Sequence, residues 1–227
     1  MTRQIQSELN QLREDFLQVY ALVATDLRQA VQAAVTADRE LVQEVRQTEA
    51  LVNESEVAVE AECLRLIALH APVADDLRFV IGVLLVNRDL ERIGDLAAAV
   101  AGKAENLSQP AAGFGPDLNA LADRVLDMLQ RAVDSFIQGD QMLAKSVVAD
   151  RAEAHLRQRE TSSLLRGQIL ERAADAGYLL DVLSITKYLE RAADHAANIA
   201  EEVLYMLGGE IVRHRTPAAA PRAVPAT

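Results

Sequence analysis

The sequence predicts an all-α protein of six long helices, arranged as two tandem three-helix-bundle repeats. Half of its 227 residues are apolar but only 4% are aromatic, so the apolar content is mostly alanine, leucine and valine. Alanine and leucine are strong helix formers. Residues 1–71 contain neither proline nor glycine, which favours long uninterrupted helices. A segment near residue 90 also recurs near residue 189, which indicates a repeat.

The first three helices are expected over residues 4–35, 39–70 and 73–105. Asp38 is a plausible N-cap for the second, because it stands at the best break in the first 71 residues. Pro72 separates the second helix from the third and fits the first turn of the latter. The segment SQPAAGFGPD at 108–117 then concentrates two prolines and two glycines, which marks a linker.

Three more helices follow the linker, with breaks at Gly139-Asp140 and around Ala176-Gly177. We expect them over residues 117–138, 140–171 and 177–207. The final residues, rich in proline and alanine, have too little apolar surface to fold. The predicted organisation is therefore a first repeat at 1–107, a linker at 108–116, a second repeat at 117–210 and a disordered tail at 211–227.

Charge and composition exclude several classes of function. The formal charge of −11 makes nucleic acid and anionic membranes unlikely primary partners. A single cysteine, Cys63, cannot form an internal disulfide, so we expect a buried thiol in a reducing compartment. Met1 is followed by a polar segment, and no apolar run approaches the length of a membrane span. These features predict a cytoplasmic protein that reaches the membrane only through partners.

The repeat is clearest in two segments of twelve residues. Residues 90–101 read LERIGDLAAAVA and residues 189–200 read LERAADHAANIA, which are identical at seven positions. Each copy holds two carboxylates four residues apart, Glu91 with Asp95 and Glu190 with Asp194. Each pair continues a stripe of apolar residues that is expected to face a neighbouring helix. The first stripe begins at Leu77 and Ile81, and the second begins at Ala176 and Leu180.

Like charges at this spacing oppose helix formation, so a positive group should compensate them. The compensating group could be protein, since Arg88 and Arg92 flank the first pair and Lys187 and Arg191 flank the second. It could also be a hard metal ion, because paired carboxylates supply the oxygen ligands that such ions accept. The residues alone leave both interpretations open.

The segments LERIGD and LERAADHAANIAEEVLYMLGGE resemble the signature segments of the PhoU family of phosphate-uptake regulators. The segment CLRLIALHAPVADDLR at 63–78 resembles the part of that family that leads into its first signature helix, and the resemblance covers nearly the whole chain. It implies an elongated bundle of two three-helix repeats. It also implies metal on Glu91, Asp95, Glu190 and Asp194, with the ion being iron, manganese, zinc or magnesium.

The resemblance further implies a non-enzymatic negative regulator of phosphate uptake and of the phosphate-starvation response. Such a protein would link the ATPase subunit of the phosphate ABC transporter to a sensor histidine kinase, and the resemblance leaves room for a homodimer. The sequence agrees with a role without catalysis, since it has no phosphate-binding loop, nucleophile elbow or Cys-His pair.

This chain departs from the family pattern in its first repeat, where Leu96 and Ala99 replace the usual histidine and asparagine. The second repeat keeps His195 and Asn198, so the two sites are expected to differ. Arg88, Lys187, His195 and Asn198 are expected around the carboxylates without binding metal directly. Further ligands are sought among acidic residues on neighbouring helices: Asp26, Asp76, Asp127 and Asp134.

Two other classes stay open at this stage. One is a metal-storing or purely structural bundle with no phosphate role, whose carboxylates serve ion pairing alone. Storage is poorly supported, because the Glu-x-x-His spacing of ferritin-like sites is missing. The other class is an acidic coiled-coil scaffold for a different partner.

Overall fold

The computed structural model describes residues 3–107 and 115–208, and within these ranges it contains helices and no strands. The expected all-α fold of six long helices is confirmed, with bounds within one residue of those predicted. The predicted tail at 211–227 and most of the predicted linker lie outside the described residues. The elements are α1 (Arg3–Thr36), α2 (Arg39–His70), α3 (Ala74–Ala104), α4 (Leu118–Gln138), α5 (Gln141–Glu171), the short 3-10 helix η1 (Ala173–Asp175) and α6 (Ala176–Gly208).

Aspartate caps begin the second helix of each repeat. The side chain of Asp38 accepts hydrogen bonds from the backbone N–H groups of Glu40 and Leu41, at 2.8 and 3.3 Å. Asp140 accepts from Met142 and Leu143 in the same way, at 2.8 and 3.0 Å. These bonds satisfy N–H groups that have no partner within the helix, which is why the chain turns at these two places.

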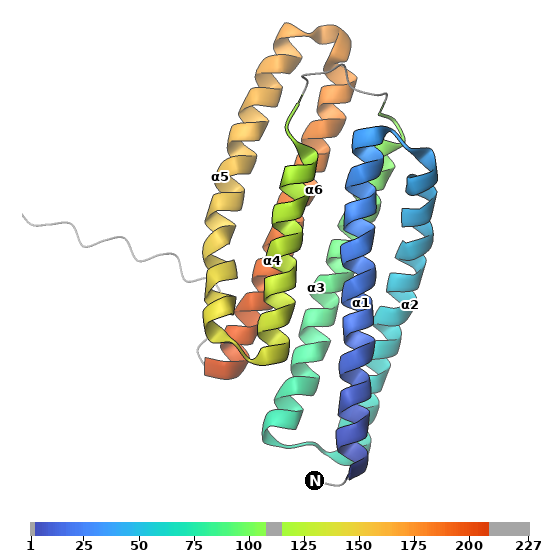
Figure 1. The fold of residues 1–227 in the computed structure, drawn as a ribbon, viewed down its shortest axis with the longest axis vertical. Coiled ribbons are helices and arrows are strands. Elements are labelled where there is room, and N and C mark those ends of the chain that lie inside the picture. The colour runs from blue at the N-terminus through green and yellow to red at the C-terminus, as the bar shows by residue number, and fades with distance from the viewer. Residues whose placement is uncertain (1–2, 108–114, 209–227) are drawn as a thin grey trace, which may run out of the picture.

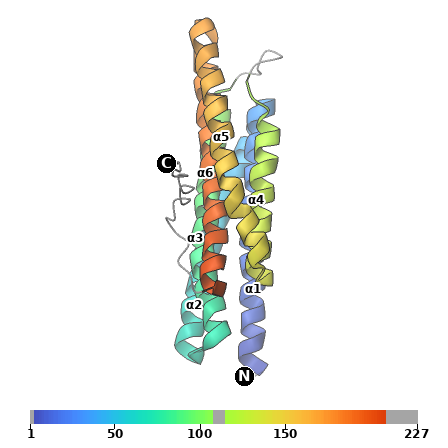
Figure 2. The same cartoon turned by 90° about the vertical axis from the view of Figure 1, so that its left-hand side faces the viewer.

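The centre of the bundle is the pair α3 and α6. Helix α3 contacts α1, α2 and α6, and helix α6 contacts α4, α5 and α3. The α2–α3 turn and the α5–α6 turn lie at opposite ends of the long axis (Figure 1). Figure 2 shows α1 and α4 on the same side of the central pair, where they contact each other. The two repeats therefore pack together along their length and share one core.

Three phenylalanine rings mark the place where the repeats meet. Phe16 of α1 and Phe136 of α4 make an edge-to-face contact with ring centroids 5.5 Å apart. Phe136 also stacks on Phe79 of α3, with centroids 5.7 Å apart. Phe16 is fully buried and Phe136 nearly so. This cluster joins α1 and α3 of the first repeat to α4 of the second.

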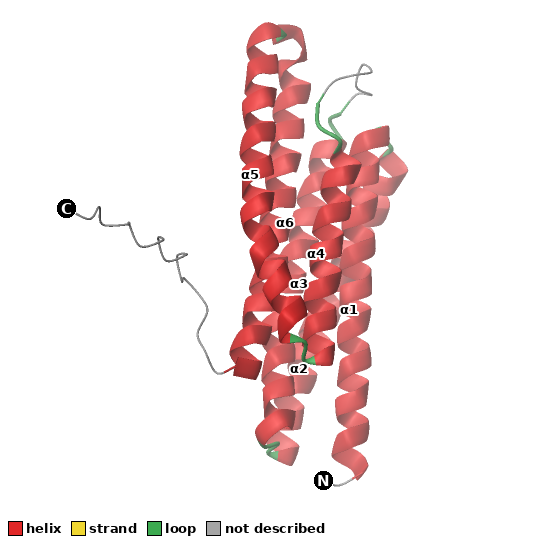
Figure 3. Cartoon of the chain, turned by 60° about the vertical axis from the view of Figure 1, so that its left-hand side comes forward, coloured by secondary structure: helices red, strands yellow, loops and turns green. Residues whose placement is uncertain are grey.

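The two repeats differ in the length of their first helix. Helix α1 has 34 residues, whereas α4 has only 21. The N-terminal part of α1 runs down to the α2–α3 turn (Figure 1). Helix α4 begins well short of the α5–α6 turn, so that turn and the adjoining parts of α5 and α6 project beyond it (Figure 3). The projecting end of α5–α6 thus lacks the cover that α1 gives to α2–α3.

The apolar stripe leading to the paired carboxylates lies at the edge of the core. Leu77 and Ile81 on α3 are 37% and 39% exposed, and Leu180 on α6 is 52% exposed. The expectation that each stripe faces a neighbouring helix along its whole length is therefore wrong at its beginning. Because three helices contact α3, its buried face is broad and is centred on other residues, including Val83 and Leu90.

Cys63 is fully buried on α2, as its apolar surroundings in the sequence suggest, and burial raises the pKa of its thiol to about 12. Among the described residues, no helix is both long and apolar enough to cross a lipid bilayer.

Gly82 is a tight position between the repeats. A Cβ atom there would lie 2.4 Å from Sδ of Met206 and 2.6 Å from a ring carbon of Phe136. We expect Gly82→Ala to lower the free energy of unfolding by about 1–3 kcal/mol, because α3 must shift away from α4 and α6. The control is Gly102→Ala on the same helix, where nothing lies within 4 Å. That control should gain up to ~1 kcal/mol from helix propensity, and urea denaturation of both variants checks the difference.

Candidate functional site

The carboxylate pair of the second repeat is bridged by a histidine. Nδ1 of His155, on α5, lies 2.6 Å from Oε1 of Glu190, and its Nε2 lies 3.0 Å from Oδ1 of Asp194. One imidazole ring therefore reaches both carboxylates, which lie one turn apart on α6. When protonated, His155 would supply the positive charge that the pair requires.

Arg151 adds a second cation from the same face of α5. Its guanidinium lies 2.7 Å from Glu201, bonds the side-chain oxygen of Asn198, and donates to the backbone carbonyl of Asp194 at 3.0 Å. Its Nε also lies 3.5 Å from the Asp194 carboxylate. Side chains from α5 therefore contact both carboxylates of the pair in the second repeat.

The carboxylate pair of the first repeat is much less neutralised. Its ion-pair partner is Arg92, which lies 3.4 Å from Glu91 and 3.2 Å from Asp95 and is itself exposed. Glu56 on α2 approaches the pair from the neighbouring helix. The pKa of Glu56 is raised mainly by burial, and further by the charges of Glu60 and Glu91. Burial, then the charge of Asp95, likewise raise the pKa of Glu91.

Asp26 on α1 is an unusual buried acid in the first repeat. It is fully buried and neither of its carboxylate oxygens has a hydrogen-bond partner. The pKa of Asp26 is raised to about 7, mainly by burial and further by the charge of Glu49. A Cβ on Gly94 would lie 3.2 Å from Val52 and 3.8 Å from Val23, so these three helices meet there. Asp26 on α1 and Glu49 on α2 are each three residues from that contact, about one helical turn away.

The other predicted site residues lie in several places. Asp76 is in the first turn of α3, about 22 Å along the helix from Glu91. Asp127 on α4 pairs with Arg131 at 2.8 Å. Asp134, also on α4, is half-buried, and its charge adds to the effect of burial in raising the pKa of Tyr20. Arg88 is exposed near Glu56, and Lys187 is exposed on α6.

His195 and Asn198 reach across to the first repeat, and Asn198 also accepts a hydrogen bond from Arg151 beside the second carboxylate pair. Nδ1 of His195 lies 2.8 Å from Oδ1 of Asp89 on α3, and the amide of Asn198 donates to the same oxygen at 3.5 Å. Lys103 of α3 makes a similar bridge to Asp181 of α6 at 2.9 Å. These groups form polar links between the two central helices.

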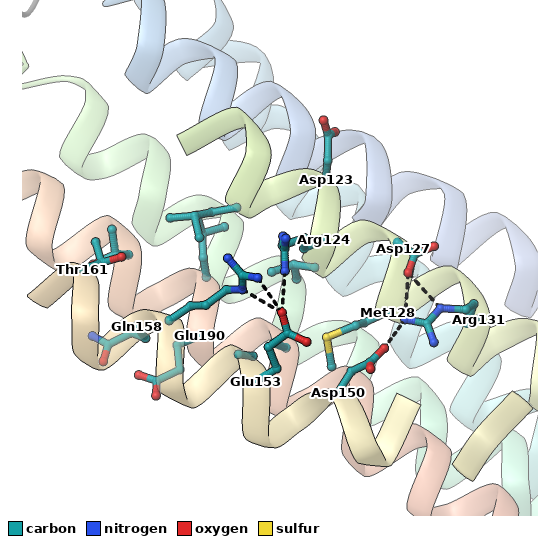
Figure 4. Close-up of a pocket in the computed structure, with 17 residues that line it drawn as sticks. Asp123, Arg124, Asp127, Met128, Arg131, Asp150, Glu153, Gln158, Thr161 and Glu190 are labelled. Carbon is teal, nitrogen blue, oxygen red and sulfur yellow. Dashed lines mark hydrogen bonds and ion pairs between the residues drawn. The ribbon is translucent and has the colours of Figure 1, made fainter. Parts of the chain in front are cut away.

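A pocket of about 400 Å³ opens between α4, α5 and α6, beside Glu190 (Figure 4). Its rim is charged and internally paired. Arg124 and Arg157 lie 3.1 and 2.6 Å from Glu153, while Arg131 lies 2.8 Å from Asp127 and 2.5 Å from Asp150. Asp127 and Glu190 both line this pocket, but Asp127 is paired with Arg131.

Within residues 3–107 and 115–208, no three acidic, histidine or cysteine side chains are grouped as ready metal ligands. The two sites nevertheless differ in chemistry: the first brings Glu56 of α2 near Glu91 of α3, and the second pairs its carboxylates with His155 and Arg151 of α5. His155 and Arg151 were not predicted from the sequence as part of this site. Their spacing of four residues, which matches that of Glu190 and Asp194, was a usable signal.

The fold and these sites define a duplicated helical bundle with a cluster of charged side chains in each repeat. The PhoU domain family matches residues 16–104 and 118–203, one match in each repeat. This chain therefore belongs to the PhoU family.

Curated relatives and solved structures agree with this assignment. Two proteins named phosphate-specific transport system accessory protein PhoU homolog, from Pseudomonas putida and Pseudomonas aeruginosa, are 34% and 35% identical. Each match covers 94% of this chain, and 84% and 89% of the respective relatives. These names describe accessory proteins and not enzymes, as the sequence predicts for this chain.

The crystal structure of PhoU from Pseudomonas aeruginosa superposes with a TM-score of 0.83 at 32% identity, covering 90% of this chain and 99% of that one. The crystal structure of the phosphate transport system regulatory protein PhoU from Streptococcus pneumoniae gives a TM-score of 0.82 at 28% identity. That match covers 92% of this chain and 99% of the other.

Proposed function

We propose that this protein is an accessory regulator of a phosphate transport system, which restrains phosphate uptake and the phosphate-starvation response when phosphate is plentiful. The observation that carries the proposal is the match of both repeats to the PhoU domain, over almost the whole length of relatives named as transport accessory proteins. In this proposal the protein works in the cytoplasm.

As an adaptor, the protein would contact the ATPase subunit of the phosphate ABC transporter and a sensor histidine kinase. The shape of the bundle supports contact with large partners, because α1 alone is about 51 Å long. Helix α2 also exposes apolar side chains along its outer surface, with Val57, Leu64 and Leu69 each more than half exposed. Such residues suit a partner helix or domain.

Alkaline phosphatase activity in phosphate-rich medium tests the regulatory role. A strain that lacks this gene should show higher activity than its parent, and a plasmid copy of the gene should restore the low level. An unchanged level in the deletion strain, where no second PhoU-family gene is present, would contradict the proposal.

We further propose that metal binds in the first repeat, at Glu91 and Asp95, with Glu56 as a neighbouring acid on α2 and Asp26 as a further candidate ligand on α1. The residues fit a hard cation, because Asp26 is a buried carboxyl with no hydrogen-bond partner and the pKa of Glu91 is raised by burial and by Asp95. A bound cation would supply the positive charge that these acids lack. An all-oxygen set favours magnesium, manganese or iron over zinc.

The second repeat favours the alternative role of ion pairing alone. His155 already lies 2.6 Å from Glu190 and 3.0 Å from Asp194, so a metal there must displace the ring or bind it as a ligand. Glu190 and Asp194 are therefore proposed as the weaker of the two sites.

Metal analysis of the purified protein distinguishes the two sites. We expect Glu91→Gln with Asp95→Asn to remove most of the bound iron or manganese, because the first repeat holds the less neutralised acids. The matched pair Glu190→Gln with Asp194→Asn should remove less, and all four changes together should remove the metal entirely. Stoichiometric metal in the fourfold variant would refute the ligand assignment.

A further inference from the structure

A second pocket, of about 370 Å³, lies between α5 and α6 and shares Gln158 and Glu190 with the first pocket. Helix α5 lines it with Gln158, Arg159, Ser162, Ser163 and Arg166, and helix α6 lines it with Lys187 and Glu190. Four of these residues share one face of α5, because residues three or four positions apart are neighbours on a helix: Arg159, Ser162, Ser163 and Arg166. Three cations and two hydroxyl groups therefore surround one pocket of an otherwise acidic chain.

No acid within the described residues pairs with these three cations. In the described part of the chain, neither Arg159, Arg166 nor Lys187 makes a side-chain hydrogen bond or an ion pair. The neighbouring pocket is different, since its arginines are all held by acids. The one acid here, Glu190, is engaged by His155.

The first repeat contains an arginine at a comparable position that is held by ion pairs. Arg65 on α2 lies five residues before the end of its helix at His70, as Arg166 does before the end of α5 at Glu171. Arg65 pairs with Glu62 at 2.5 Å and with Glu8 of α1 at 2.6 Å.

Both partners are missing for Arg166. The residue three positions before it is Ser163, where Arg65 has Glu62. The short α4 has no part that corresponds to the N-terminal region of α1 that holds Glu8. The second repeat therefore has the hydroxyl group of Ser163 where the first has the carboxylate of Glu62. Within the described residues, the guanidinium of Arg166 has no acid to pair with.

We propose that this pocket binds a phosphate group, carried either by inorganic phosphate or by a short polyphosphate. Guanidinium groups form two parallel bonds to phosphate oxygens, and an ammonium adds a point charge. Ser162 accepts a hydrogen bond from Gln158 at 2.8 Å, which leaves its own O–H able to donate. A tetrahedral dianion with several acceptor oxygens matches this set of donors. The proposal is independent of the regulatory role, because it concerns binding by the purified protein.

Isothermal titration calorimetry with inorganic phosphate and with tripolyphosphate tests the proposal. Fixed ionic strength limits non-specific charge effects, and EDTA excludes phosphate held through a metal. We expect saturable binding that weakens at least about tenfold in the variant Arg159→Gln with Arg166→Gln. The probe that binds more tightly identifies the source of the phosphate group.

The matched control is Arg39→Gln with Lys145→Gln, which removes the same charge from exposed positions outside the pocket. It should change the affinity less than about twofold, since long-range charge effects are screened. Equal weakening in both variants, or no saturable binding of either probe, would overturn the proposal. Binding only to phosphatidylglycerol vesicles would also overturn it, because the cations would then form a membrane-contact surface.

Discussion

Replacing Phe16 with alanine will lower the free energy of unfolding by about 3–5 kcal/mol. The ring is fully buried, and its edge-to-face contact with Phe136 joins α1 to α4 across the two repeats. Its removal leaves a cavity that close-packed helices cannot easily fill. Urea denaturation followed by circular dichroism measures the loss.

A leucine that is large but exposed provides the control. Leu164 on α5 is 70% exposed, so Leu164→Ala should change the free energy of unfolding by no more than about 0.5 kcal/mol. Similar losses in the two variants would show that Phe16 is not part of a well-packed junction. Because the buried residues of both repeats form one core, the wild type should unfold in a single transition.

Replacing Asp26 with asparagine will stabilise the metal-free protein at pH 8 by roughly 2–4 kcal/mol. Burial and then Glu49 raise the pKa of Asp26 from 3.8 to about 7 in the folded protein. The folded state therefore binds more protons than the unfolded state between these two values. The stability of the wild type should fall as the pH rises through this window and should level off above it.

The variant should lack this part of the pH dependence, so its advantage over the wild type should shrink at pH 5. Thermal melts in EDTA from pH 5 to pH 8 measure both effects. Asp15→Asn on the same helix is the control, because asparagine can still accept the hydrogen bond from Gln11. A loss of stability in Asp26→Asn at pH 8 would contradict the expected protonation of this buried acid.

Added metal should reverse the result at Asp26 if the first-repeat site binds it. A cation beside the carboxylate stabilises its charged form, so the wild type would gain stability that the asparagine variant lacks. The same measurement thus separates an acid that only destabilises the apoprotein from one that assists metal binding.

The first and second repeats illustrate how a duplicated motif diverges. Both keep the two carboxylates at a spacing of four residues, but α5 presents His155 and Arg151 where α2 presents Glu56. Whether a carboxylate pair suits a metal therefore depends on the helix opposite, and the repeated motif alone does not contain that information.

The sequence by itself determined the helices, their ends and the repeat. These depend on local features: Asp38 and Asp140 satisfy nearby N–H groups, Gly139 adopts a positive φ of 67° at the end of α4, and prolines fall between helices. A local hydrogen bond or backbone preference acts within a few residues, so its outcome can be predicted from neighbouring letters.

Only the tertiary structure decided which faces are buried and which charges are paired. The stripe beginning at Leu77 lies at the edge of the core because three helices contact α3 elsewhere on its surface. Asp26 lacks a hydrogen-bond partner, and Arg166 lacks the acids that hold Arg65. Such pairings join residues far apart in the chain, and desolvation depends on every helix that packs nearby, so no local pattern fixes them.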